Sequence, residues 1–262
     1  MSRKSSSGKA PHGASKPKGP GRSWPYWLAG AVLVGSLTYA KFFRSDSKGI
    51  SYLGQQREPA PAKSMEATAP GQKAGVALNQ GTYWMSQGDV TNALASYQKA
   101  LQLAPEDADV HYNLGLAYAR LGAPVQAEEH YRKALELSPD YPEVHNNLGL
   151  LLQRKSELKE AEAEFHEAIR LFPEYAKAHN NLGSFYAQQK RLPEAVGCYE
   201  KAVELDGEQW DAWFNLGQAR KQLGDSPGAL KALQQALRLN PDFEPARRLV
   251  NSLQSQPAPM LP

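Results

Sequence analysis

Cysteine is almost absent from this chain of 262 residues, because Cys198 is the only one. A single thiol cannot form an internal disulfide, and no second cysteine is available for a metal site. The sequence also lacks a nucleophile elbow, a P-loop, a dinucleotide-binding fingerprint, and the HExxH and CxxC patterns. We therefore predict that the chain is not an enzyme, and we expect no metal and no cofactor.

The net charge of +3 hides an uneven distribution. Residues 1–48 hold nine Lys or Arg and one acid, Asp46, which leaves 21 basic and 26 acidic residues for the remainder. A basic N-terminal region suits an anionic membrane surface or a topology signal. The mildly acidic remainder argues against a nucleic-acid partner.

Long apolar runs are missing except at residues 24–43, WPYWLAGAVLVGSLTYAKFF, where no charge occurs until Lys41. Twenty residues span about 30 Å as a helix, which is the thickness of the hydrocarbon core of a bilayer. Aromatic residues lie at both ends, as in interfacial belts. We predict a transmembrane signal anchor at 24–43, a disordered basic tail at 1–23, and a flexible linker rich in Ser, Gln, Pro, Ala and Gly at 44–73.

The orientation of this anchor follows from the basic residues around it. Six Lys or Arg precede the apolar run and three follow it closely, so the positive-inside rule places the N-terminus in the cytoplasm and the remainder on the extracytoplasmic side, the periplasm in a bacterium. Two alternatives stay open. Thr38-Tyr39-Ala40 is a tolerable cleavage pattern, which would release a soluble exported protein. The remainder could also face the cytosol, as in a receptor for client proteins.

From Ala74 onward the chain repeats every 34 residues without insertion or deletion. Counted from the first residue of each repeat, position 8 is always Gly, positions 20 and 27 are always Ala, and position 24 is always large. Small residues at positions 8 and 20 would let two helix backbones approach closely, and the large residue would fill the gap beneath them. The five repeats are 74–107, 108–141, 142–175, 176–209 and 210–243.

This pattern resembles the tetratricopeptide repeat (TPR), a helix-turn-helix unit of the same length. Two positions depart from the family pattern: Gln80 stands where the other repeats have Leu, and Gly207 stands where they have Pro. The resemblance implies an all-α fold, a right-handed solenoid of five stacked repeats. We expect residues 244–254 to form a C-terminal capping helix with a polar outer face, and residues 255–262 to be a disordered tail.

In that family the concave face of the solenoid, lined by the first helix of each repeat at positions 2, 5, 6, 9, 12 and 13, holds a peptide or a partner helix. Position 6 is Asn in every repeat, which resembles the asparagine ladder of O-GlcNAc transferase. Such amides can bond an extended backbone, or they can simply satisfy neighbouring groups of the chain. The predicted peptide-binding residues are Asn79, Asn113, Asn147, Asn181, Asn215, Tyr112, Asn146, Asn180, Phe214, Arg120 and Arg154.

The charges on this face indicate a limited preference. Arg120 and Arg154 would favour anions mildly, although both could equally be solvated surface residues. The chaperone-tail clamp of related proteins needs Lys and Arg at set places, and Leu78 stands where its first Lys would be. That specificity is therefore not expected.

Three histidines, His111, His145 and His179, all occupy position 4. Zinc ligands must lie about 2.1 Å from one ion, whereas packed helix axes are about 8–10 Å apart. We therefore predict that these histidines pack between helices and hold no metal.

These observations predict a membrane-anchored scaffold or adaptor that binds an extended segment or helix of another protein and supports assembly of an envelope complex. A second hypothesis is a self-associating structural spacer, because Ala31 and Gly35 form a small-xxx-small step typical of membrane-helix pairing and of a weak homo-oligomer. The cytosol-facing receptor is the third.

Overall fold

The computed structural model describes residues 70–255, which lie in one structural unit of the chain. The segments predicted as tail and membrane anchor, 1–23 and 24–43, lie outside the described residues. None of the described helices has both the length and the hydropathy needed to cross a membrane. The helices are α1 (Pro70–Ser86), α2 (Val90–Leu103), α3 (Ala108–Leu121), α4 (Pro124–Leu137), α5 (Pro142–Arg154), α6 (Leu158–Leu171), α7 (Ala176–Gln188), α8 (Leu192–Leu205), α9 (Trp210–Gln222), α10 (Ser226–Leu239) and α11 (Glu244–Gln254).

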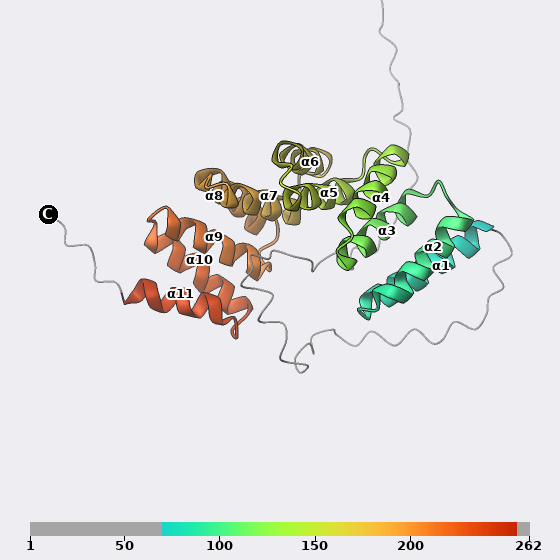
Figure 1. Cartoon of the computed structure of the whole chain (residues 1–262). Coiled ribbons are helices and arrows are strands. Elements are labelled where there is room, and N and C mark those ends of the chain that lie inside the picture. The colour runs from blue at the N-terminus through green and yellow to red at the C-terminus, as the bar shows by residue number, and fades with distance from the viewer. Residues whose placement is uncertain (1–69, 256–262) are drawn as a thin grey trace, which may run out of the picture. The chain divides into compact units, whose positions relative to one another are not determined.

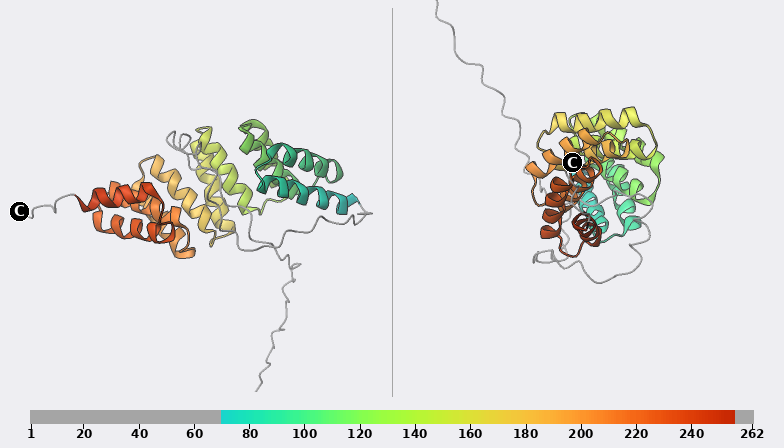
Figure 2. Two further views of the ribbon diagram at one scale, coloured as in Figure 1. Left: turned by 90° about the horizontal axis from the view of Figure 1, so that it is seen from below. Right: turned by 90° about the vertical axis from the view of Figure 1, so that its left-hand side faces the viewer.

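The described part of the chain is all α-helical and contains no strand, as the sequence predicted. Consecutive helices pair into hairpins, α1 with α2 through α9 with α10, and each hairpin packs on the next through its second helix. Figure 1 shows this order, and Figure 2 shows successive hairpins laid side by side along the unit, with α11 against the last of them. The fold is therefore a helical solenoid.

One boundary differs from the sequence prediction. Helix α1 begins at Pro70, four residues before the first predicted repeat and inside the range predicted as flexible linker. Proline fits the first turn of a helix because its missing N–H would have no intrahelical partner there. Between Pro70 and Ala74 only Gly71 has a low helix propensity. The helix therefore extends back to the proline.

The interior of each hairpin is a close contact between position 8 and position 24. A Cβ atom added to Gly115 would lie 2.5 Å from ring carbons of Tyr131, and one added to Gly149 would lie 3.0 Å from those of Phe165. Both rings are buried, and so are the alanines at positions 20 and 27. The glycine thus makes room for the aromatic ring, which confirms the packing predicted for these positions.

The turn inside each hairpin has a left-handed residue at position 15. Gly88, Gly122 and Gly224 occupy it in three repeats, with φ between 74° and 83°. Ser156 and Lys190 occupy it in the other two, and both have φ of 65°. Side chains with a Cβ pay a steric cost in this region of backbone space. The two turns therefore carry local strain that the three glycine turns avoid.

The first and last described helices, α1 and α11, differ in how much apolar surface they expose. In α1, Val76 is 58% exposed and Tyr83 is 51% exposed, because no described helix precedes them. Their counterparts one repeat later, Val110 and Ala117, are completely buried. Helix α11 instead turns Ala246 and Val250 inward and leaves polar residues such as Arg247, Arg248 and Asn251 exposed.

Candidate binding face

The asparagines at position 6 connect each repeat to the one before it. The side-chain amide of Asn147 donates to the Tyr112 hydroxyl at 3.0 Å, and that of Asn181 donates to Asn146 Oδ1 at 2.8 Å. Asn215 repeats the pattern with Asn180 Oδ1 at 3.0 Å. In all three bonds the acceptor is the side chain at position 5 of the preceding repeat. Part of the predicted ladder therefore runs along the stack and joins its repeats.

The first two asparagines behave differently. Asn113 donates to the backbone carbonyl of Asp109 in its own helix, at 2.7 Å. Its neighbour at position 5 of the preceding repeat is Leu78, which has no polar atom to accept a bond. Asn79 lies exposed on α1. The row is thus continuous from the second repeat to the fifth, and its first member remains open to solvent.

Burial divides the predicted residues into two groups. Tyr112, Asn146, Asn180 and Asn181 are all buried, and Asn146 is completely so. Asn113, Asn147 and Asn215 are only partly buried, so they keep surface that another molecule can touch. Their binding role stays a prediction.

Position 2 adds a row of charges beside the asparagines. It reads Asp109, Glu143, Lys177 and Asp211 from the second repeat to the fifth. The Asp109 carboxylate accepts a hydrogen bond from the Tyr141 hydroxyl at 2.8 Å, and the Asp211 carboxylate accepts one from the Asn180 amide at 3.1 Å. The row therefore carries three acids and one base, Lys177, in the fourth repeat.

Burial changes the acidity of these groups. It raises the pKa of Glu143, and the nearby negative Asp109 raises that pKa further. Burial lowers the pKa of Lys177, against the opposing effect of Asp211. Burial also raises the pKa of Tyr112, Tyr141 and Tyr175 well above the ordinary value for a phenol. A phenol is neutral at physiological pH even at its ordinary pKa, and burial strengthens the preference of these three tyrosines for the neutral form.

The remaining predicted residues are one aromatic residue, Phe214, and two arginines, Arg120 and Arg154. Phe214 packs edge-on against Phe243, with ring centroids 4.9 Å apart, so its aromatic surface is partly used within the fold. Arg120 is exposed and donates to the Met85 carbonyl of the preceding repeat at 3.2 Å. Arg154 is exposed in the last turn of α5. Both arginines are accessible to a ligand.

The side chains at position 4 bond the backbone of the preceding repeat. In each case a side-chain N–H faces the carbonyl at position 32 of the preceding repeat: His111 to Pro105, His145 to Pro139, His179 to Pro173, and Trp213 to Gly207, at 2.9–3.0 Å. Arg247 of α11 makes the equivalent bond to Pro241. The histidines therefore have the packing role predicted for them. Within residues 70–255 no cluster of His, Cys, Asp and Glu could hold a metal ion.

Two of these histidines also meet a titratable side chain at position 23. His111 Nδ1 lies 3.0 Å from His130 Nδ1, and His145 Nδ1 lies 2.6 Å from the Glu164 carboxylate. Burial, with the nearby His111, lowers the pKa of His130. Burial also tends to lower the pKa of His145, but the bonds to Glu164 and to the Pro139 carbonyl outweigh it and raise that pKa.

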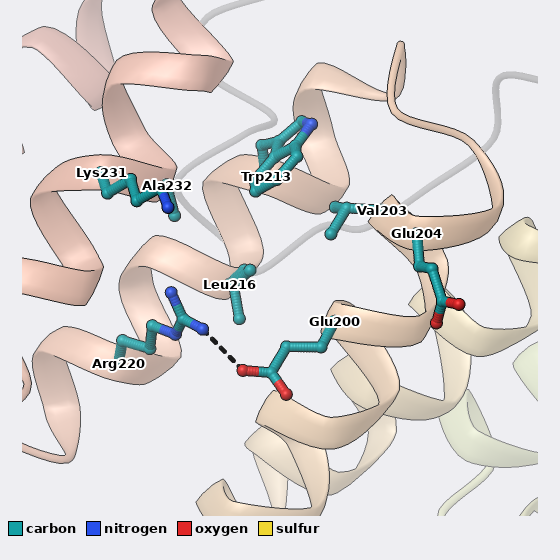
Figure 3. Close-up of a pocket in the computed structure, with 8 residues that line it drawn as sticks. All are labelled: Glu200, Val203, Glu204, Trp213, Leu216, Arg220, Lys231 and Ala232. Carbon is teal, nitrogen blue, oxygen red and sulfur yellow. Dashed lines mark hydrogen bonds and ion pairs between the residues drawn. The ribbon is translucent and has the colours of Figure 1, made fainter.

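A shallow pocket of about 250 Å³ lies between α8, α9 and α10 (Figure 3). An ion pair of 2.6 Å between Arg220 and Glu200 crosses one side of it, and Trp213 borders it. The α9 residues that line it occupy positions 4, 7 and 11, so none of them belongs to the predicted peptide-binding set. A second acid of the lining, Glu204, pairs with Lys201 outside the pocket.

Comparison with known proteins agrees with this architecture. Family models described as TPR repeat or tetratricopeptide repeat match residues 84–122, 108–141, 146–208 and 182–254. No curated protein matches the chain. The described helices therefore define an α-helical repeat protein built from stacked hairpins. Its repeats are tetratricopeptide repeats.

Solved structures show the same fold. The crystal structure of MamA is 26% identical, with a TM-score of 0.54, over 63% of this chain and 96% of that chain. YrrB, a TPR protein described as having an unusual peptide-binding site, is 26% identical, with a TM-score of 0.52, over 66% of this chain and 89% of that one. PilF of Pseudomonas aeruginosa is 24% identical, with a TM-score of 0.59, over 70% and 90%, and it shows the fold alone.

Proposed function

We propose that this protein is a scaffold that binds an extended segment of a partner protein along the first helices of its repeats. The observation that carries the proposal is the row of polar groups at positions 2, 5 and 6. The groups at positions 5 and 6 are joined by a hydrogen bond across each of three successive seams, from Tyr112 to Asn215. A row fixed in this way is preorganised, so a bound peptide need not order it, and preorganisation raises affinity.

The chemistry of this face suits a peptide. Partly buried amides at regular intervals offer donors and acceptors to an extended backbone. Tyrosines supply rigid aromatic surface at low entropic cost, and the charges at position 2 supply specificity. The similarity to YrrB supports peptide binding as the mode, since that protein has a peptide-binding site.

We further propose that the N-terminal segment 24–43 anchors the scaffold in a membrane, with the repeats on the extracytoplasmic side, and that the partner belongs to an envelope complex. The apolar run and the basic residues before it support this proposal. Protease protection on intact membranes, with a tag after Gln254, tests it. Protected and membrane-retained repeats support the anchor. Accessible repeats would place the partner in the cytosol, and protected but soluble repeats would mean a cleaved signal.

Site-specific photo-crosslinking of the full chain tests peptide binding most directly. A photoreactive residue is placed at Arg120, Arg154 or Gln218, which are exposed residues at positions 13, 13 and 9. The matched controls are Arg132, Arg170 and Glu204, which are exposed on second helices. We expect a common partner to crosslink to the first set alone. Equal labelling from both sets would overturn the proposal.

A triple change of Asn113, Asn147 and Asn181 to Ala should abolish capture of that partner. Because Asn147 and Asn181 also join repeats, the melting temperature of the variant must be measured alongside. Capture that survives in the folded variant would remove the asparagines from the binding role.

Self-association is the second candidate, and the open end of α1 favours it. Val76 and Tyr83 form an uncovered apolar surface on that helix. Changing both residues to Ser should leave a monomer if the chain pairs through this end. A chain that is monomeric before the change would exclude this candidate.

A further inference from the structure

Exposed apolar side chains gather at the turns inside the hairpins. Six large apolar side chains are exposed within residues 70–255, and two of them, Val76 and Tyr83, lie on α1. The other four lie at internal turns: Leu121, Val125, Leu158 and Leu223. Val125 is the most exposed of the six, at 71%. Single exposed apolar residues need no explanation, but a group at the same kind of turn marks an interaction surface.

The internal turns of the second, third and fourth repeats are also basic. Positions 13–18 of these repeats, residues 120–125, 154–159 and 188–193, contain six Lys or Arg and a single acid, Glu157. Glu157 is paired with Lys155 at 2.6 Å. Lys159 and Lys190 are exposed, and neither forms an ion pair with another described residue. We call these three turns the turn edge, which combines exposed aliphatic side chains with an excess of positive charge.

The turns between the hairpins have the opposite character. They comprise residues 104–109, 138–143, 172–177 and 206–211, which contain nine acids and one base. Successive hairpins lie side by side (Figure 2), so the internal turns line one edge of the unit and the connecting turns line the other. An anionic surface would attract the first edge and repel the second, and a charge distribution of this kind orients a molecule before contact.

Ion pairs between repeats join the turn edge into one surface. Lys155 pairs at 2.5 Å with Glu128 of the preceding repeat, and Arg191 pairs at 2.8 Å with Glu162 of the repeat before its own. Each of these acids lies about one helical turn beyond an exposed aliphatic residue of the turn edge. The bases of one turn are therefore held beside the aliphatic residue of the turn before it.

We propose that the turn edge docks on an anionic lipid bilayer. Leu121, Val125 and Leu158 enter the boundary between headgroups and acyl chains, and Lys159 and Lys190 lie against the anionic headgroups. The inference rests on the proposed membrane anchor and specifies how the repeats lie on the bilayer. A nucleic acid would supply the same negative charge, but the turn edge has no aromatic side chain on which a base could stack.

The proposed anchor makes weak docking sufficient. Residues 44–69 join the anchor to α1, and as a flexible chain they would span about 30 Å. A tether of this length turns docking into an intramolecular step at a high effective concentration of lipid. The few aliphatic side chains of the turn edge would bind free vesicles poorly, whereas the tethered edge needs only a modest free energy of its own.

The test places the full chain in proteoliposomes and reads the surroundings of one fluorophore on each edge. An environment-sensitive fluorophore is attached at Gln126→Cys, next to the turn edge, or at Asp140→Cys, on the opposite edge, after Cys198→Ala has removed the native thiol. In vesicles of phosphatidylglycerol and phosphatidylcholine we expect a blue shift at Gln126 and none at Asp140. In phosphatidylcholine alone, or at high salt, the shift at Gln126 should be lost.

Two glycine variants separate docking from stability. Lys190→Gly removes a charge and relieves a left-handed backbone with φ of 65°, so it should weaken docking about fivefold while the fold gains stability. Ser156→Gly relieves the same strain without losing a charge, so docking should not change. The blue-shifted fraction and denaturant unfolding are measured on the same variants. Equal docking in the two variants would overturn the proposal.

A second pair of variants tests the aliphatic residues. Val125→Ser should reduce the blue shift at Gln126 several-fold. Leu223→Ser should leave it unchanged, because Leu223 lies in the fifth repeat, where positions 13–18 contain no base. The same effect from both substitutions would contradict docking through the turn edge.

Flotation of the proteoliposomes distinguishes this inference from the proposed anchor. A chain that floats with the vesicles but shows no shift at Gln126, or equal shifts on both edges, keeps its anchor and overturns the docking; an acidic protein would then be the occupant of the turn edge. A chain that does not float refutes the anchor. An N-terminal His-tag on nickel-chelating lipid then restores the tether, and the shift at Gln126 decides the docking alone.

Discussion

Within each hairpin the closest contact between the two helices is apolar and nearly the same in all five repeats, whereas the seams between hairpins add hydrogen bonds to their apolar packing, and these bonds differ from one seam to the next. Position 8 glycine meets the large residue at position 24 every time. At the seams, a tyrosine hydroxyl accepts in one case and an asparagine amide in the next. The contacts inside the hairpins therefore stabilise all five repeats in the same way. The contacts between hairpins differ from one repeat to the next, and there a repeat array can acquire specificity.

The largest loss of stability is expected from disrupting the contact between the glycine at position 8 and the large residue at position 24. Gly115→Ala would place a methyl group 2.5 Å from the buried ring of Tyr131. Overpacking of this kind costs about 1–3 kcal/mol, even after alanine's better helix propensity returns up to about 1 kcal/mol. Denaturant unfolding followed by far-UV circular dichroism measures the loss. Gly75→Ala is the matched control, because its Cβ would meet nothing within 4 Å, and it should stabilise the fold slightly.

Removing one hydrogen bond between repeats should lower the free energy of unfolding by somewhat less. Asn215→Ala removes the donor to Asn180 Oδ1, a group on a side chain that is 3% exposed. Leaving that acceptor unpaired costs about 1–2 kcal/mol. Asn113→Ala is the control, because its amide bonds only a carbonyl of its own helix. Equal losses in the two variants, measured by the same denaturation, would show that the seam bonds add nothing beyond local structure.

The turns at position 15 can be made the same in all five hairpins by substitution. Lys190→Gly and Ser156→Gly place glycine at the two position 15 residues that hold φ of 65° with a Cβ. Each change should raise the free energy of unfolding by about 1 kcal/mol, because the left-handed region penalises such residues. The converse change, Gly122→Ala, should lower it by a similar amount. Unchanged stability in all three variants would mean that the turns bear no strain.

The smallest effects are expected from pH, and they have opposite signs at two histidines. The lowered pKa of His130 means that the unfolded chain binds more protons below about pH 6.5, so this site loses stability as the pH falls below that value. The raised pKa of His145 gives stability that is fully present below about pH 6.5 and is lost as the pH rises through the folded-state pKa.

Glu164→Gln should therefore destabilise the protein more at about pH 5.5 than at about pH 8, and His130→Gln should reduce the loss that the parent suffers in acid. Unfolding free energies across this pH range check both variants. A Glu164→Gln variant with the same deficit at every pH would show that the ion pair does not set the titration of His145.

The hairpins could be predicted from the sequence because their contacts lie at fixed distances along the chain. Gly115 and Tyr131 are separated by one helix-turn-helix step, and the 34-residue period carries that relation. The left-handed turn at position 15 was not predicted, because glycine occupies it in only three repeats and Ser156 and Lys190 occupy it in the others.

The seams could not be predicted in the same way. Asn147 and Asn181 look identical in the sequence, yet one donates to a hydroxyl and the other to a buried amide. Which acceptor each one meets depends on helix packing across repeats, which the period alone does not specify. The unpaired Nδ2 of the buried Asn146 is likewise a product of packing that the 34-residue period does not reveal.

The order of the two seam partners along the chain has a consequence for synthesis on the ribosome. Asn147, Asn181 and Asn215 are all donors, and each acceptor belongs to the repeat that is translated earlier. A newly made hairpin can pack its own glycine and aromatic ring at once, but its seam closes only when the next first helix emerges. We therefore expect the nascent chain to gain stability in steps one repeat behind translation, with its most recent hairpin the last to be secured.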